Sequence, residues 1–308
     1  MNNTEKYINN HKRVFSLKNK RNKNHTKRPK SLAGSSIYAL IKYHLKSIIR
    51  LIIYYPVELI NFRDFFVKVW KLKGEKKNRK AIVLGNGPSQ SYVTSEELDN
   101  FVKSGGETIC VNNWHQNKEL ANHTPTWLVF SDPLSFDTNE PNAVNLIDYV
   151  KNNSSIKILI PTSQIKLIKK IGLKNEIYCF VDLELSIWKN LNPFLPRGYM
   201  SITLYKALAW SIYLGYRSIG VLGMDNTLPR NIYNDDQNRV HLLESYAGVE
   251  DCLVDVSSYH SSVASYYFDV FKIFYHLEYF PKKKIFNLDP YSLTDRFKKI
   301  SKDMFFSD

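Results

Sequence analysis

The chain has 308 residues, 44% of them hydrophobic, and carries a formal net charge of +14 at pH 7. This charge comes from one end: residues 1–80 hold 21 of the 43 basic residues and only four acidic ones, whereas the remaining 228 residues hold 22 basic and 25 acidic ones. Because a nucleic-acid enzyme usually has excess positive charge around its site, this distribution argues against a nucleic-acid partner.

Residues 1–35 form a basic, polar arm that we expect to be disordered, because it has few apolar residues to bury. Residues 36–79 are predicted to be helical, with apolar residues at spacings of three and four on one stripe. The stripe consists of Ile37, Leu40, Ile41, Leu45, Ile48, Ile49, Ile52 and Ile53, and basic residues occupy other positions. This pattern is typical of helices that lie on an anionic membrane surface, so we expect residues 1–70 to bind one.

The same segment is not expected to span a membrane, because Arg50, Pro56 and Glu58 interrupt its longest apolar run. An alternative is that the helix packs on the body of the protein and that residues such as Tyr55 and Phe66 belong to the core. The three cysteines have neither disulfide nor zinc spacing, which favours a reducing, cytoplasmic compartment.

Residues 80–308 alternate between strand-like and helix-like segments. Strands are predicted at 81–84, 108–111, 127–130, 156–160, 177–181, 218–222 and 284–287, and helices at 95–103, 143–151, 165–170, 199–214, 261–279 and 292–300. Such alternation predicts an α/β fold in which a mostly parallel sheet is covered by helices on both faces. The polar segment at about 226–258 is predicted to form a small lid.

The first strand runs into Gly85-Asn86-Gly87-Pro88-Ser89. Glycines can take positive φ and have no Cβ, so this loop is expected to let its backbone lie against a ligand, and Asn86 offers both donors and acceptors. The pattern is neither the dinucleotide fingerprint nor a phosphate loop. A tight turn without a ligand would use similar residues.

Three further strand ends carry Asn or Asp, namely Asn112-Asn113, Ser131-Asp132 and Asp225-Asn226. In parallel sheets ligands bind beyond the carboxyl ends of strands, so these residues predict a hydrogen-bonding pocket suited to sugar hydroxyls and a nucleobase edge. The alternative is that Asn and Asp occur there only because strands turn.

With the helix end Leu214-Gly215-Tyr216 and the pair His260-Ser261, these motifs occur in the same order in the bacterial family 42 sialyltransferases, which this chain resembles over residues 80–298. The resemblance implies a GT-A-like, Rossmann-type nucleotide-binding domain. It also implies inverting transfer of sialic acid from CMP-sialic acid to a glycan acceptor in lipooligosaccharide or capsule, without a metal or other cofactor. A cytoplasmic homo-oligomer peripheral to the inner membrane would fit this function.

The resemblance also assigns roles to individual residues. His260 matches the general base, with His241 as a rival, and Tyr233 matches one of two phosphate-binding tyrosines, whereas Thr227 stands at the other. Asp132 stands where the family usually has Asn, and Arg197 lies near an expected arginine. The residues expected to bind the donor are Gly85, Asn86, Gly87, Asn112, Asn113, Asp132, Thr203, Asp225 and Arg197.

These departures leave three alternatives open. One is a transferase that uses another CMP-activated nonulosonic acid or Kdo. A second is a protein like the pterin pyrophosphokinases, whose chemistry needs metal-binding acids that the sequence does not clearly supply. The third is a noncatalytic, membrane-associated protein of polysaccharide assembly.

Overall fold

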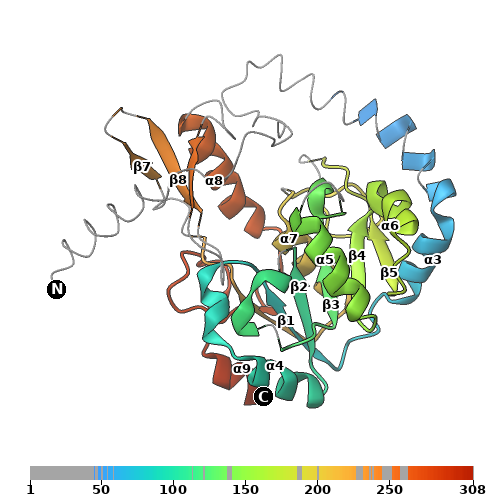
Figure 1. The fold of residues 1–308 in the computed structure, drawn as a ribbon, viewed down its shortest axis with the longest axis horizontal. Helices are drawn as coiled ribbons and strands as arrows, with labels where there is room; N and C mark the ends of the chain where they lie inside the picture. Colours follow the sequence, from blue (N-terminus) through green and yellow to red (C-terminus); the bar gives the residue numbers. More distant parts are fainter. Residues whose placement is uncertain are drawn as a thin grey trace.

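The structure is a computed structural model that describes the core of the chain and parts of its N-terminal segment. The described residues are 45, 48–49, 51–53, 55–57, 59–112, 114–120, 122–136, 141–185, 189–199, 201–226, 232–235, 237, 239–244, 252–256 and 263–307. They form one eight-stranded sheet with helices on both faces and one three-stranded sheet beside it (Figure 1). The basic arm at 1–35 lies outside the described residues.

The large sheet is parallel at each of its strand pairs, and its order is β11-β10-β6-β1-β2-β3-β4-β5. Its strands are β1 (Lys80–Leu84), β2 (Glu107–Val111), β3 (Trp127–Val129), β4 (Lys157–Pro161), β5 (Ile177–Phe180), β6 (Ser218–Leu222), β10 (Ile285–Asn287) and β11 (Lys298–Lys299). The chain builds the sheet outward from β1 in one direction and then returns to β6 on its other side. The switch point of this doubly wound sheet therefore lies between β1 and β6, where such folds bind ligands.

Helices cover the two faces of this sheet through two separate clusters of buried side chains. Alternate residues of β1 show the division, since Ala81 and Val83 belong to one cluster and Ile82 and Leu84 to the other. The first cluster includes α7 (Thr203–Leu214) and the end of α8 (Val263–Leu277), and the second includes α4 (Ser95–Lys103), α5 (Pro141–Asn152), α6 (Ile165–Ile171) and α9 (Lys302–Ser307). Helix α3 (Arg63–Lys71) contributes to both, through Val69 and Phe66. The predicted fold class is confirmed.

Local sequence explains several helix boundaries. A capping box between Thr94 and Glu97 starts α4, and Gly215, with φ of +88°, ends α7. The helix predicted at 199–214 begins only at Thr203, because Ile202 is extended.

The helix predicted at 292–300 is wrong. Ser292 donates its hydroxyl to the carbonyl of Met224 at 2.7 Å and accepts from the backbone N–H of Thr294, and Lys298–Lys299 pairs with β10. Short polar side chains that bond to the backbone in this way compete with helix formation. The helix of this region is α9, which starts at Lys302.

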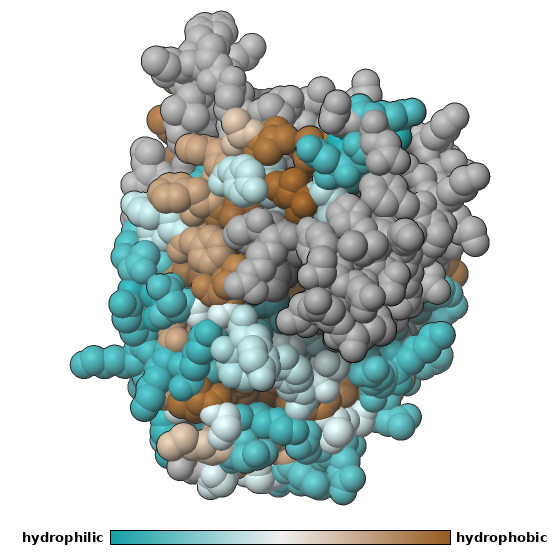
Figure 2. Space-filling view, turned by 90° about the vertical axis from the view of Figure 1, so that its left-hand side faces the viewer, coloured by the Kyte–Doolittle hydropathy of each residue, from teal (hydrophilic) through white to brown (hydrophobic). Residues whose placement is uncertain are grey.

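The predicted lid segment contains an antiparallel sheet of β7 (Ile232–Asn234), β8 (Val240–Glu244) and β9 (Cys252–Asp255). Leu242 packs with Val256 and with Tyr266 and Val270 of α8, and Figure 1 shows β7, β8 and α8 together at one side of the large sheet. The face on this side mixes hydrophobic areas with hydrophilic ones (Figure 2). The role of this segment as a lid stays a prediction.

The N-terminal segment packs on the body of the protein with one side and leaves apolar side chains exposed on the other. One side packs on the body: Phe66 and Val69 are buried, and the hydroxyl of Tyr55 donates to the carbonyl of Phe194 at 2.5 Å. The other side is exposed and includes Leu45, Ile48, Ile49, Ile52, Ile53, Val57 and Ile60. Among the described residues no helix is both long and apolar enough to cross a membrane.

Candidate functional site

The loops after β1 and β6 meet at the switch point. Leu84 and Leu222 are paired across the two strands, so Gly85 and Gly223 follow side by side. A Cβ on either glycine would overlap the carbonyl group of the other, and a Cβ on Gly87 would overlap the carboxylate of Asp225. Glycine is therefore required here because two loops pack against each other.

This finding corrects the reason given for the glycines. Gly85 and Gly87 do not have positive φ, and Gly87 is extended at −70°, whereas Gly223 has φ of +70°. Whether this loop contacts a ligand stays a prediction for Gly85, Asn86 and Gly87.

Ser89 joins the two loops by hydrogen bonds in both directions. Its backbone N–H donates to Oδ1 of Asp225 at 3.0 Å, and its hydroxyl accepts from the N–H of Gly223 at 2.8 Å. Burial, and then the charge of Asp289 on the loop after β10, raise the pKa of Asp225 to about 6. Asp225 thus lies at the switch point as a buried carboxyl group whose pKa is raised above its ordinary value.

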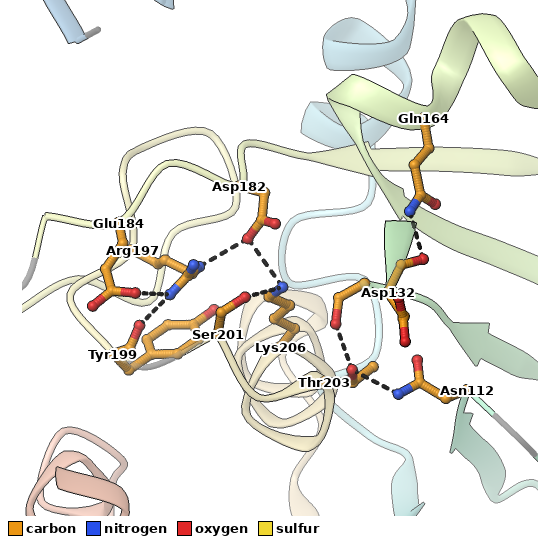
Figure 3. Close-up of polar contacts among 11 residues, drawn as sticks. Asn112, Asp132, Gln164, Asp182, Glu184, Arg197, Tyr199, Ser201, Thr203 and Lys206 are labelled. Carbon is orange, nitrogen blue, oxygen red and sulfur yellow. Dashed lines mark hydrogen bonds and ion pairs between the residues drawn. The ribbon is translucent and has the colours of Figure 1, made fainter. Parts of the chain in front are cut away.

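A second polar group lies where β2 and β3 end, at the start of α7 (Figure 3). Asn112 has φ of +41° and donates Nδ2 to Oγ1 of Thr203 at 2.9 Å, and the hydroxyls of Thr203 and Ser131 are hydrogen-bonded to each other. The residue before α7, Ile202, makes no side-chain cap. The first N–H groups of this helix therefore have no side-chain acceptor from the capping position and favour a negatively charged ligand group.

Gln164 joins this group from the end of β4, and the sequence analysis did not identify it. Its Nε2 donates to the backbone carbonyl of Asp132 at 2.8 Å, and its side chain is buried (Figure 3). Asp132 is partly buried and follows β3. The structure thus brings Asn112, Asp132 and Thr203 together, as expected for a common site.

Arg197 is buried in a network of charged groups. Its Nε donates to Oδ1 of Asp182 at 2.9 Å, and its Nη1 donates to Glu184 at 3.1 Å and to the carbonyl of Tyr199 at 2.5 Å. Burial alone would lower the pKa of Arg197, but the two carboxylates hold it above its usual value. In the structure the guanidinium of Arg197 is bonded to these three partners. The expected contact of Arg197 with the sugar donor stays a prediction.

The same network reaches α7 through Lys206, which is 2% exposed. Its Nζ lies 3.0 Å from both Asp182 Oδ1 and Ser201 Oγ (Figure 3). Burial lowers the pKa of Lys206 to about 8, although Asp182 opposes this shift. Because Lys206 lies one turn after Thr203, the network fixes the start of the helix that carries Thr203.

The lid sheet carries two of the residues considered for chemistry. Tyr233 on β7 is paired with His241 on β8, and His241 Nε2 lies 3.0 Å from Asp235 Oδ2. The hydrogen bond from His241 is the main cause that lowers the pKa of Asp235. Asn113, Thr227 and His260 lie outside the described residues, so their predicted roles stay predictions.

A search of the described part of the chain finds no group of three or more His, Cys, Asp or Glu side chains that could hold a metal ion. The polar groups that the structure brings together at the site are amides and hydroxyls, together with Asp132 and Asp225. Such groups suit a polyhydroxylated ligand better than a bare metal ion.

No family model matches this sequence, and no curated protein matches it. One solved structure, that of MAf glycosyltransferase from Magnetospirillum magneticum AMB-1, is similar with a TM-score of 0.44 and 11% sequence identity. The match covers 76% of this chain and 37% of the other, so this chain spans little more than a third of that protein's length. The chain is thus an α/β protein with a doubly wound parallel sheet and a polar candidate site at its carboxyl edge.

Proposed function

We propose that the protein is a glycosyltransferase that moves sialic acid from CMP-sialic acid to a terminal sugar of a bacterial surface glycan. The observation that carries this proposal is the group formed by Asn112, Ser131, Gln164 and Thr203 beside the switch point. Amide and hydroxyl groups of this kind hydrogen-bond to sugar hydroxyls, and the uncapped start of α7 suits an anionic group of the donor.

In an inverting reaction the acceptor hydroxyl attacks the anomeric carbon of the donor sugar while the bond to the CMP phosphate breaks. The hydroxyl proton goes to a base, for which we propose His260. Negative charge develops on the departing phosphate, and we propose that hydrogen bonds from Tyr233 and Thr227 stabilise it. These neutral donors would make a divalent cation unnecessary.

The first experiment is hydrolysis of CMP-sialic acid by the purified protein with EDTA present, compared with CMP-Kdo and other CMP-nonulosonates. Release of CMP from CMP-sialic acid supports the proposal. Release from another donor alone identifies a transferase with a different sugar. If no donor is hydrolysed and CMP does not bind, the transferase proposal is refuted. That result favours a noncatalytic protein of polysaccharide assembly.

We also propose that the protein binds an anionic membrane surface peripherally. Seven apolar side chains between residues 45 and 60 are between 38% and 75% exposed, and 21 basic residues lie in residues 1–80. Such a combination supports interfacial binding, in which apolar burial and charge attraction add.

Membrane binding is tested by liposome co-sedimentation with the full chain. The double variant Ile52→Glu, Ile53→Glu changes side chains that are 67% and 56% exposed, so it leaves the core intact. We expect it to lose binding to anionic vesicles, and we expect added salt to weaken binding of the unaltered chain. Tyr291→Glu, at a side chain 76% exposed in another region, is the control. Equal binding by all three chains would refute the proposal.

A further inference from the structure

We propose that Gln164 and Asn112 form the subsite for the transferred sugar, and that their amide oxygens accept hydrogen bonds from its hydroxyl or N–H groups. This inference rests on the proposed function and deepens it, because it names the part of the donor that the ends of β2 to β4 recognise.

Gln164 has a fixed amide orientation. It is 5% exposed, and its Nε2 donates to the carbonyl of Asp132 at 2.8 Å. Rotating the amide by half a turn would place Oε1 against that carbonyl, which is also an acceptor. Oε1 must therefore point away from Asp132, and among the described residues this buried oxygen has no hydrogen-bond partner.

Asn112, on the other side of Asp132, also has a buried amide oxygen without a described partner. Its Nδ2 is used by Thr203, whereas its Oδ1 is buried and has no hydrogen-bond partner in the described part of the chain. Its φ of +41° is a left-handed backbone conformation that Asn adopts more readily than most residues. A buried acceptor without a donor is costly, so two such oxygens at one edge of a sheet call for donors from a ligand or from water.

The chemistry of these oxygens decides which part of the donor they meet. Both are acceptors, so they need a ligand that brings O–H or N–H groups. An ionised phosphate has only acceptor oxygens and is excluded at both positions. The sugar of the donor carries several hydroxyls and, in many nonulosonic acids, an amide N–H, so it fits.

The spacing agrees with a large sugar. Asn112 follows β2 and Gln164 lies just beyond β4, with β3 between these strands. Two strand spacings separate the backbones by about 10 Å. A nine-carbon sugar with an extended side chain is long enough to span this separation.

The test is calorimetric binding of CMP-sialic acid and of free CMP to full-length variants without an acceptor. Gln164→Met keeps the length of the side chain and removes the amide. We expect it to weaken binding of CMP-sialic acid about tenfold, the loss of roughly one hydrogen bond, while binding of CMP changes less than twofold. Equal losses for both ligands, or no loss for either, would overturn the inference.

A stability measurement separates ligand binding from folding. Urea unfolding of Gln164→Met reports the loss of the hydrogen bond to the carbonyl of Asp132, whereas the ratio of the affinities for CMP-sialic acid and CMP reports the subsite. A variant that loses stability but keeps the affinity ratio of the unaltered protein would point to a structural role and overturn the inference.

The matched control is Asn175, which also has a buried amide oxygen without a described partner but lies before β5, at the opposite edge of the sheet. Asn175→Leu should change stability and leave the preference for CMP-sialic acid unchanged. A loss of that preference as large as in Gln164→Met would contradict a local subsite. If the unaltered protein binds CMP but no CMP-sugar, both the proposed function and this inference fail. If the unaltered protein binds CMP-sialic acid and the Gln164 variant binds it as well, only this inference fails.

Discussion

The backbone of Gly85 lies against that of Gly223, so closely that a Cβ on either residue would overlap the carbonyl group of the other. The N–H of Gly87 also donates to the carbonyl of Gly223 at 3.2 Å. The two loops at the switch point therefore have one joint conformation, and a side chain added to either displaces both.

Gly223→Ala tests this close approach, and Gly172→Ala is its control. The two glycines have nearly equal φ values, +70° and +73°, but a Cβ on Gly172 would meet nothing within 4 Å. We expect a loss of about 1 kcal/mol in unfolding free energy for Gly172→Ala, from backbone strain alone. Gly223→Ala should lose about 3 kcal/mol because overpacking adds to the strain. Urea unfolding measures both, and equal losses would show that the loops can separate at no cost.

Asp225→Asn tests the carboxyl group at the switch point. Because burial and Asp289 raise its pKa from 3.8 to about 6, the folded protein binds more protons than the unfolded chain between these values. The contribution of Asp225 to stability is therefore present below pH 3.8 and is lost as pH rises through about 6. At pH 7.5 the variant should be more stable than the unaltered protein, by up to about 3 kcal/mol for a shift of two pKa units.

The measurement for Asp225→Asn is a series of urea unfolding curves from pH 4 to pH 8. The gain should shrink steadily toward pH 4, and Asp303→Asn, at an exposed aspartate, should show no such trend. A gain that does not depend on pH would mean that ionisation of Asp225 is not the cause.

The strands could be predicted from sequence because the large sheet is buried on both faces. Residues 81–84 and 219–222 are continuous runs without a polar side chain, as expected of central parallel strands, and both lie in strands in the structure. Strand order could not be predicted in the same way, since it depends on contacts between distant residues. For this reason the close contact between Gly85 and Gly223 could not be predicted from the sequence. The glycines after β1 suggest a ligand-binding loop, whereas in the structure they pack against the loop after β6.

Gln164 could not be found for the same reason. It follows Pro161-Thr162-Ser163 and has no recognisable motif around it. Its place in the site depends on the pairing of β4 with β3, which brings its amide to the carbonyl of Asp132. Asn112 and Asp132 could be expected at one edge of the sheet because both lie just after apolar strands, whereas Thr203 was assigned only through the resemblance.

His260→Ala tests the proposed base. Transfer should fall at least about a hundredfold, because the acceptor hydroxyl loses its proton acceptor, while binding of CMP stays unchanged. His241→Ala is the comparison, since His241 Nε2 is already held by Asp235 at 3.0 Å and should affect transfer much less. Initial rates and CMP affinity are measured for both. The reverse order of effects would assign the base to His241, oriented by Asp235.

Glu107→Gln tests a buried carboxylate at the start of β2 that hydrogen-bonds to four side chains. Glu107 is 3% exposed and accepts from Lys76 Nζ at 2.6 Å, Arg79 Nη1 at 2.9 Å, Trp127 Nε1 at 3.0 Å and the hydroxyl of Tyr216 at 2.5 Å. Burial alone would raise its pKa, but these donors outweigh it and hold the pKa below the ordinary 4.5. The amide leaves Lys76 without its charged partner, so we expect a loss of about 3 kcal/mol at pH 7.

The pH dependence of this loss has a definite sign. Because the folded pKa of Glu107 is lowered, its contribution to stability is complete above pH 4.5 and is lost as pH falls through the folded value. The gap between the unaltered protein and Glu107→Gln should therefore close in acid. Glu119→Gln, at an exposed position, should change stability by less than about 0.5 kcal/mol at any pH. Urea unfolding at pH 7 and below pH 4 measures the gap, and a constant gap would mean that the charge of Glu107 contributes nothing to stability.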